Sequence, residues 1–145
     1  MVADRQQMIE TLKERVVPHL RERGFKGSFP HFRRIGESKT DLLMFQFDKW
    51  GGGFIIELGE GPADELVQHW GERVPAAKLT VPVLSLASRV RLVADNAATS
   101  ETWFRFDANT RAAFDDAADN VVRLLPQADG WWRGERDQPN IRAFN

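Results

Sequence analysis

The chain has 145 residues, no cysteine, and 20 basic against 21 acidic residues, so its formal net charge is −1. This length matches one domain of common size, and the lack of cysteine excludes disulfides and thiolate metal sites. The charges are balanced and interspersed, whereas a nucleic-acid-binding protein usually shows a basic excess or a basic stripe. We expect a single α+β domain over residues 1–145, with nucleic acid disfavoured as a partner and no cofactor or metal indicated.

The ends and apolar stretches of the sequence predict a soluble, cytoplasmic protein without a membrane partner. The chain is charged from Asp4 onward and lacks the apolar segment of a signal peptide. No stretch approaches the ~18 apolar residues that a membrane-spanning helix needs.

The first predicted helix covers residues 4–23. Its apolar residues recur at intervals of four and are Met8, Leu12, Val16 and Leu20. Asp4 is the expected N-cap, and Gly24 is the expected residue just beyond the C-terminal end. Pro18 inside a helix would remove a backbone hydrogen bond at a cost of ~3 kcal/mol. We therefore expect a kink near Val17 or two shorter helices.

Two apolar stretches on either side of Trp50-Gly51-Gly52-Gly53 predict a β-hairpin. Its strands cover residues 42–49 and 54–59, and they follow a predicted first strand over 28–35 and a turn at 36–41. Residues 59–62 are expected to interrupt the regular secondary structure. The spacing of apolar residues over 63–74 then predicts a helix that ends at Pro75.

The C-terminal half adds two strands and one helix. Strands are predicted at 89–94 and 102–106, with a loop at 95–100 and no clear structure at 76–87. The last helix runs from Asn109 or Thr110 to Leu125 and ends at Pro126. Residues 127–145 are predicted to form a polar tail, in which Trp131 and Trp132 pack on the core or form an interface, and we favour the core.

The order of elements, α-β-β-β-(α)-β-β-α, predicts a mostly antiparallel sheet of about five strands with helices packed on one face. Because side chains alternate along a strand, the hairpin has one wholly apolar face. The residues of this face are Leu43, Phe45, Phe47, Phe54, Ile56 and Leu58. The predicted register pairs Phe47 with Ile56 and thereby sets Gln46 opposite Glu57.

The opposite, polar face of the hairpin carries the candidate binding residues. Gln46, Asp48 and Glu57 lie on it, and the flanking strands add Arg33 and Arg91. The face is either solvated with cross-strand ion pairs or a site that binds a protein or small molecule. The first hypothesis is therefore a non-enzymatic binding module that uses this face, with no catalytic residue assigned and the oligomeric state open.

Two other functions are compatible with the same residues. Asp48 and Glu57 on adjacent strands would form paired carboxylates for acid–base work, which would make the protein a small hydrolase- or isomerase-like enzyme. Nucleic-acid binding through Arg33, Arg34, Arg89 and Arg91 is the weakest hypothesis because of the charge balance.

Glu65 and His69 lie four residues apart on the predicted helix over 63–74, a spacing compatible with a metal site or an acid–base pair. Such pairs often arise by chance, and a structural role is the stronger expectation.

Several short motifs occur in a characteristic order along the chain. They are Gly24-Phe25-Lys26, Phe32-x-Arg34, Phe45-Gln46-x-x-Lys49-Trp50, Phe54-x-x-x-Leu58-Gly59, Arg89-x-Arg91-Leu92 and Trp103. In this order they resemble the bacterial domain-of-unknown-function family 4304 over residues 5–125. The resemblance implies a bacterial protein and supports the hairpin, whereas the acidic Glu57 departs from the amide expected there.

Overall fold

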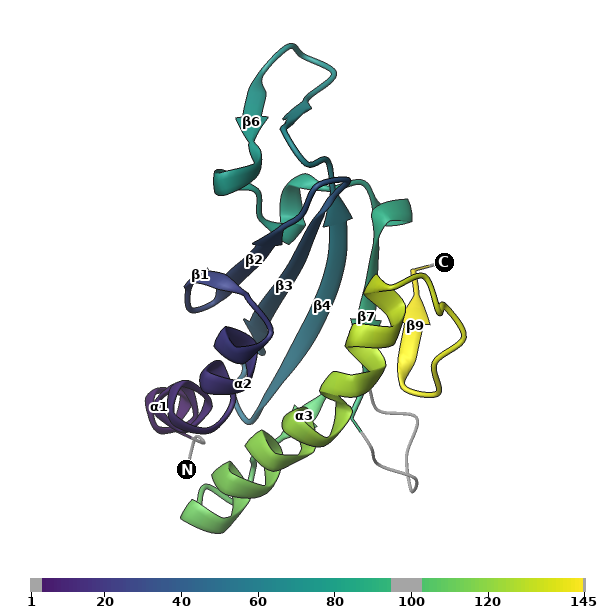
Figure 1. Cartoon of the computed structure of the whole chain (residues 1–145). Helices are drawn as coiled ribbons and strands as arrows, with labels where there is room; N and C mark the ends of the chain where they lie inside the picture. Colours follow the sequence, from purple (N-terminus) through teal and green to yellow (C-terminus); the bar gives the residue numbers. More distant parts are fainter. Residues whose placement is uncertain (1–3, 95–102, 145) are drawn as a thin grey trace.

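The computed structural model describes residues 4–94 and 103–144, which form a twisted antiparallel sheet with helices packed on one face (Figure 1). This arrangement confirms the predicted α+β fold. Within the described residues, no helix is long and apolar enough to cross a membrane.

The N-terminal helical segment consists of two helices, α1 (Arg5–Arg15) and α2 (Val17–Glu22). Asp4 caps α1, because its carboxylate accepts a hydrogen bond from the Gln7 backbone N–H at 3.2 Å. Pro18 lies in the first turn of α2, where a backbone N–H has no acceptor within the helix, so the proline removes no helical hydrogen bond. The expected interruption near Val17 is therefore confirmed.

The main sheet has seven strands in the described residues, against about five predicted. In chain order they are β1 (Lys26–Ser28), β2 (His31–Ile35), β3 (Thr40–Phe47), β4 (Gly53–Gly61), β7 (Arg89–Leu92), β8 (Phe104–Arg105) and β9 (Ile141–Ala143). The spatial order is β1-β2-β3-β4-β7-β9, and β8 pairs with β4 beyond the end of β7. Strands of three residues such as β1 and β9 are too short to display the alternation by which a strand is recognised in a sequence.

The β3–β4 hairpin has the predicted faces but not the predicted register. Phe45 lies opposite Ile56, so the prediction was wrong by two residues. The turn comprises residues 49–52, one residue earlier than expected, because Gly51 and Gly52 occupy the left-handed backbone region that a turn uses. A shift of two leaves every side chain on its predicted face.

Two predictions between β4 and β7 were wrong. Strand β4 continues through Gly61 instead of breaking at Gly59. Residues 63–74 form a second hairpin, β5 (Glu65–Val67) and β6 (Arg73–Pro75), instead of a helix. Gly71, with φ of 98°, supplies its turn, and the helical Glu65–His69 pair is therefore absent.

Residues 76–87 had no predicted structure, and the segment 76–88 forms three 3-10 turns that cover part of the outer sheet face, the face away from the helices. The turns are η1 (Ala76–Lys78), η2 (Val81–Val83) and η3 (Leu86–Ser88). They contribute to an apolar cluster made of Leu42, Met44, Ala76, Leu79, Val81 and Leu84. The face predicted to be polar is thus apolar where β3 crosses it.

Helix α3 (Arg111–Trp132) is longer than predicted, because it continues through Pro126. Thr110 caps it as one of the two expected residues. The turns beyond Pro126 bury Ala128, Trp131 and Trp132, and this burial outweighs the ~3 kcal/mol that an internal proline costs. The predicted polar tail is therefore helix up to residue 132 and strand at β9, and both tryptophans pack on the core.

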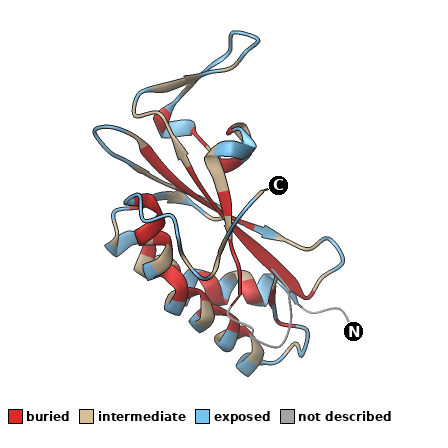
Figure 2. Ribbon diagram, turned by 90° about the vertical axis from the view of Figure 1, so that its right-hand side faces the viewer, coloured by how far each residue is buried: buried red, intermediate tan, exposed pale blue. Residues whose placement is uncertain are grey.

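The main core lies between the helices and the inner face of the sheet (Figure 2). Its aromatic rings include Phe54 and Phe104, which stack with centroids 5.1 Å apart. Trp132 joins α3 to the sheet, since its indole N–H donates to the Gly59 carbonyl at 3.2 Å. The six apolar residues predicted for the inner face of the hairpin all pack in this core.

Replacing Phe54 by alanine is expected to lower the free energy of unfolding by about 3–5 kcal/mol, because the ring is fully buried. Trp50→Ala in the same hairpin is the control, since Trp50 is 80% exposed and its loss should change stability by less than about 0.5 kcal/mol. Urea unfolding followed by circular dichroism measures both. Equal losses would contradict the assignment of the inner face.

Candidate functional site

Three arginines and one glutamate lie on neighbouring strands of the outer sheet face, and we call Arg89, Arg91, Arg142 and Glu57 the arginine cluster. Glu57 lies on β4 directly opposite Arg91 on β7. Arg91 in turn lies directly opposite Arg142 on β9. Because directly opposed residues share a face, strand pairing alone brings these side chains together.

Glu57 is the buried centre of the cluster, with its side chain only 5% exposed. Its Oε1 lies 3.3 Å from Arg89 Nη1, and its Oε2 lies 3.7 Å from Arg91 Nε. Burying a carboxylate is costly unless it is paired, and the two arginines supply that pairing for Glu57. Glu57 thus contacts two of the three arginines, and Arg142 lies one strand further along the sheet.

The arginines keep unused hydrogen-bonding capacity. The Nε atoms of Arg89 and Arg91 are buried, and neither has a hydrogen-bond partner among the described residues. The ring of Phe144 lies 5.8 and 5.1 Å from these two guanidinium groups, which stabilises their charge. Arg142 is exposed, and within the described residues its hydrogen bonds go to backbone carbonyls, including that of Ile141 at 3.3 Å.

This arrangement suits the binding of an anion. Two like charges directly opposite each other in a sheet are unfavourable, and an anion placed between Arg91 and Arg142 would relieve their repulsion. Guanidinium groups bind carboxylates and phosphates through paired hydrogen bonds.

The structure brings together only part of the predicted site. Glu57 and Arg91 are in contact, and Gln46 lies a diagonal step from Glu57 because it faces Ile55. Arg33 is instead tied to the 3-10 segment, where its Nε donates to the Leu79 carbonyl at 3.0 Å.

Asp48 lies far from Glu57, which corrects the predicted carboxylate pair. It ends the strand at the turn, with its backbone N–H bonded to the Gly53 carbonyl. Four residue positions along the strand separate the two carboxylates by roughly 13 Å. Asp48 pairs with Arg105 at 3.6 Å instead. The paired carboxylates that the enzyme hypothesis required are therefore absent.

The arginines of the nucleic-acid hypothesis do not share one face. Arg34 lies on the helix side, where it binds Asp41 at 2.8 Å, while Arg33 lies on the other side. Among the described residues, no group of histidine, aspartate and glutamate side chains could hold a metal ion.

His31 is another titratable group on the outer face, directly opposite Met44 in the strand pairing. Burial lowers its pKa, and the positive charge of Arg33 lowers the pKa further. His31 is therefore neutral near pH 7, and it adds no charge to this face.

Two contributors to the cluster were missed in the sequence. Arg142 and Phe144 lie in the segment predicted to be a polar tail, where three residues of strand leave only a faint alternation from Ile141 to Phe144. Arg89, named above among the nucleic-acid candidates, lies in this cluster.

Comparison with known proteins yields one family. The model of a family described as "Domain of unknown function (DUF4304)" matches residues 16–144, nearly the whole chain. No curated protein and no solved structure matches this chain. The match confirms the resemblance seen in the motifs and extends it beyond residue 125 through α3 and β9.

Replacing Glu57 by glutamine is expected to lower the free energy of unfolding by about 3 kcal/mol, because it leaves two arginines beside an uncharged amide. Glu135→Gln is the matched control, since Glu135 forms an exposed ion pair with Arg133 and its loss should cost about 0–1 kcal/mol. Thermal and urea unfolding measure the difference. A cost for Glu57→Gln no larger than that of the control would refute the anchoring role.

Proposed function

Since this chain belongs to the DUF4304 family, whose description names no activity, we propose a function from its own residues. The protein is a non-enzymatic binding module, and its arginine cluster holds an anionic group of a protein or small-molecule partner. The observation that carries this proposal is the opposition of Arg91 to Arg142 beside the single carboxylate of Glu57.

The charge of the cluster supports an anionic partner. Glu57 neutralises one of the three arginines and leaves two positive charges on neighbouring strands. The side chains of Arg89 and Arg91 are 19% and 35% exposed, so a partner can reach them. Carboxylate and phosphate groups have the charge and geometry that guanidinium groups recognise.

The surroundings of Glu57 favour binding over acid–base catalysis. The polar side chains in contact with Glu57 in the described part of the chain are Arg89 and Arg91. Arginine keeps its proton at all physiological pH values, so neither can exchange a proton with the glutamate. Glu57 therefore serves to position the arginines.

We propose that the protein acts in the cytoplasm. The complete lack of cysteine supports a reducing compartment, since small secreted domains often rely on disulfides.

The proposal predicts that an acidic peptide binds at β7 and β9. Titration of ¹⁵N-labelled protein with a hexaglutamate peptide, and with a phosphoserine peptide, should shift backbone amide resonances of these strands. Arg142→Glu should weaken binding by about tenfold or more, because it reverses a charge at the contact. Added salt should weaken it as well.

Lys13→Glu is the control for this titration, because Lys13 is an exposed cation on α1, away from the outer sheet face. It should leave binding unchanged. Equal losses in the two variants, or no shifts at β7 and β9 with either peptide at ~10 mM, would reject the proposal.

A further inference from the structure

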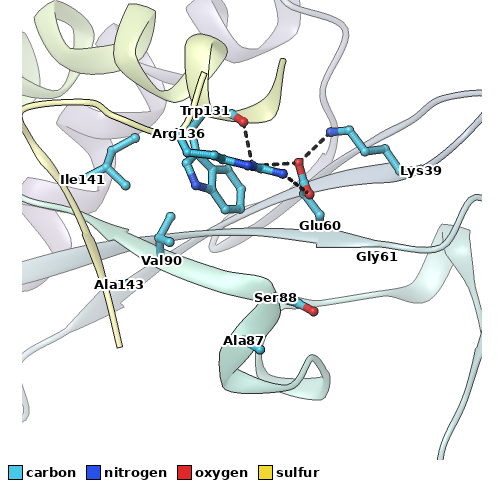
Figure 3. Close-up of a pocket in the computed structure, with 10 residues that line it drawn as sticks. All are labelled: Lys39, Glu60, Gly61, Ala87, Ser88, Val90, Trp131, Arg136, Ile141 and Ala143. Atoms are coloured by element: carbon cyan, nitrogen blue, oxygen red, sulfur yellow. Dashed lines mark hydrogen bonds and ion pairs between the residues drawn. The ribbon is translucent and has the colours of Figure 1, made fainter. Parts of the chain in front are cut away.

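A second site lies on the helix side of the same sheet edge, in a cleft of about 580 Å³ (Figure 3). We call it the α3-end cleft, since it opens where α3 ends above β7 and β9. Its main lining residues are Lys39, Glu60, Val90, Trp131, Arg136 and Ala143. The volume falls within the range of small-molecule sites.

Arg136 forms one wall of the cleft and is firmly held there. Its Nη1 and Nη2 donate to the two oxygens of Glu60 at 3.1 and 2.9 Å, and Nη1 also donates to the Trp131 carbonyl at 2.7 Å. Its guanidinium lies over the Trp131 ring, 4.4 Å from the centroid. Figure 3 shows this arrangement. A guanidinium fixed on three sides is oriented before any ligand arrives.

Glu60 is the charged group that holds Arg136 in place. Burial acts to raise its pKa, but the hydrogen bonds and charges of Arg136 and Lys39 outweigh burial and lower the pKa below its usual value. Glu60 is therefore ionised at neutral pH, and Arg136 stays in place.

The cleft keeps free donors and an excess of positive charge. Of the five N–H donors of Arg136, the one on Nε and one on Nη2 have no hydrogen-bond partner in the described residues. Lys39 lies 3.0 Å from Glu60 and also pairs with Asp41, which Arg34 already neutralises. Of the charged residues that line the cleft, Lys39 and Arg136 are cations and Glu60 is the anion, which leaves one positive charge.

The floor of the cleft is apolar. Val90 on β7 lies directly opposite Ala143 on β9, and Ile141 borders them. The side of the cleft formed by these residues offers no charged group. A ligand that fits both parts has one negative charge and an apolar body.

We propose that the α3-end cleft binds a small organic acid, whose single carboxylate contacts Arg136 and whose apolar body lies on Val90, Ile141 and Ala143. This site is separate from the arginine cluster, which lies on the other face of the sheet. A single negative charge matches the excess of one positive charge, and the apolar floor selects a carbon skeleton over a bare inorganic anion.

The test is a titration of ¹³C,¹⁵N-labelled protein with phenylacetate and octanoate, and with phenylacetamide and inorganic phosphate as comparison ligands. The acids should shift the Trp131 indole N–H and the Val90 methyl resonances. Phenylacetamide should bind about tenfold or more weakly, because it lacks the charge. Phosphate should leave the Val90 methyl resonances unmoved.

Two pairs of variants locate the contacts. Arg136→Gln should weaken binding of the acids by about tenfold, whereas Arg133→Gln, which changes an exposed arginine outside the cleft, should not. Ala143→Phe should fill the cleft and block binding, while Ala143→Ser leaves it open. Ala143 is exposed on a short edge strand, so the larger side chain is compatible with folding.

The proposal is overturned if neither acid shifts these resonances at ~10 mM, if the amide or phosphate shifts them at the same concentrations as the acids, or if Arg136→Gln and Arg133→Gln behave alike. Arg142→Glu should leave binding of the acids unchanged, so a failure of the arginine cluster and a failure of this cleft are told apart.

Discussion

The pairing of β3 with β4 is the constraint on which the rest of the molecule depends. Eight residue pairs join the two strands, from Thr40 with Gly61 to Phe47 with Phe54. Their apolar side chains form the floor of the main core, and α1 and α3 pack over it. The same pairing presents Glu57 to β7 on the opposite face. A slip of β4 by one residue would bury Glu57 in the core and expose Phe54, Ile56 and Leu58, so packing and charge select the same arrangement.

Alternation in the sequence was sufficient to assign the faces of this hairpin but not its register. A shift of two residues leaves each face intact, and only the turn distinguishes the two registers. The turn depends on which glycines adopt a left-handed backbone, and three in succession left that choice open. The helix predicted over residues 63–74 was wrong for a related reason. Leu66, Val67 and Trp70 have spacing compatible with a helix, yet Gly71 turns the chain into a hairpin.

The candidate site was predictable only where it lies on strands long enough to be recognised. Glu57 and Arg91 are embedded in clear apolar alternation, and both belong to the arginine cluster. Arg142 lies on a three-residue strand after a helix that passes through Pro126, and the usual rule for proline ended that helix too early. Arg136 lies in the same segment, residues 127–145, which was predicted to be a polar tail. Both proposed sites thus depend on the segment of the sequence in which local signals were weakest.

The position of α3 in the chain has a consequence for biosynthesis. The strands that form the aromatic floor are complete by Arg105, but the helix that covers much of this floor begins only at Arg111, and Trp132 lies at its far end. During synthesis, the phenylalanines of the sheet therefore leave the ribosome before α3, which packs over them, has been made. Partly synthesised chains therefore expose an apolar sheet face, which is the kind of surface that aggregates or recruits chaperones. Folding is expected to be completed late, when the C-terminal segment reaches the sheet.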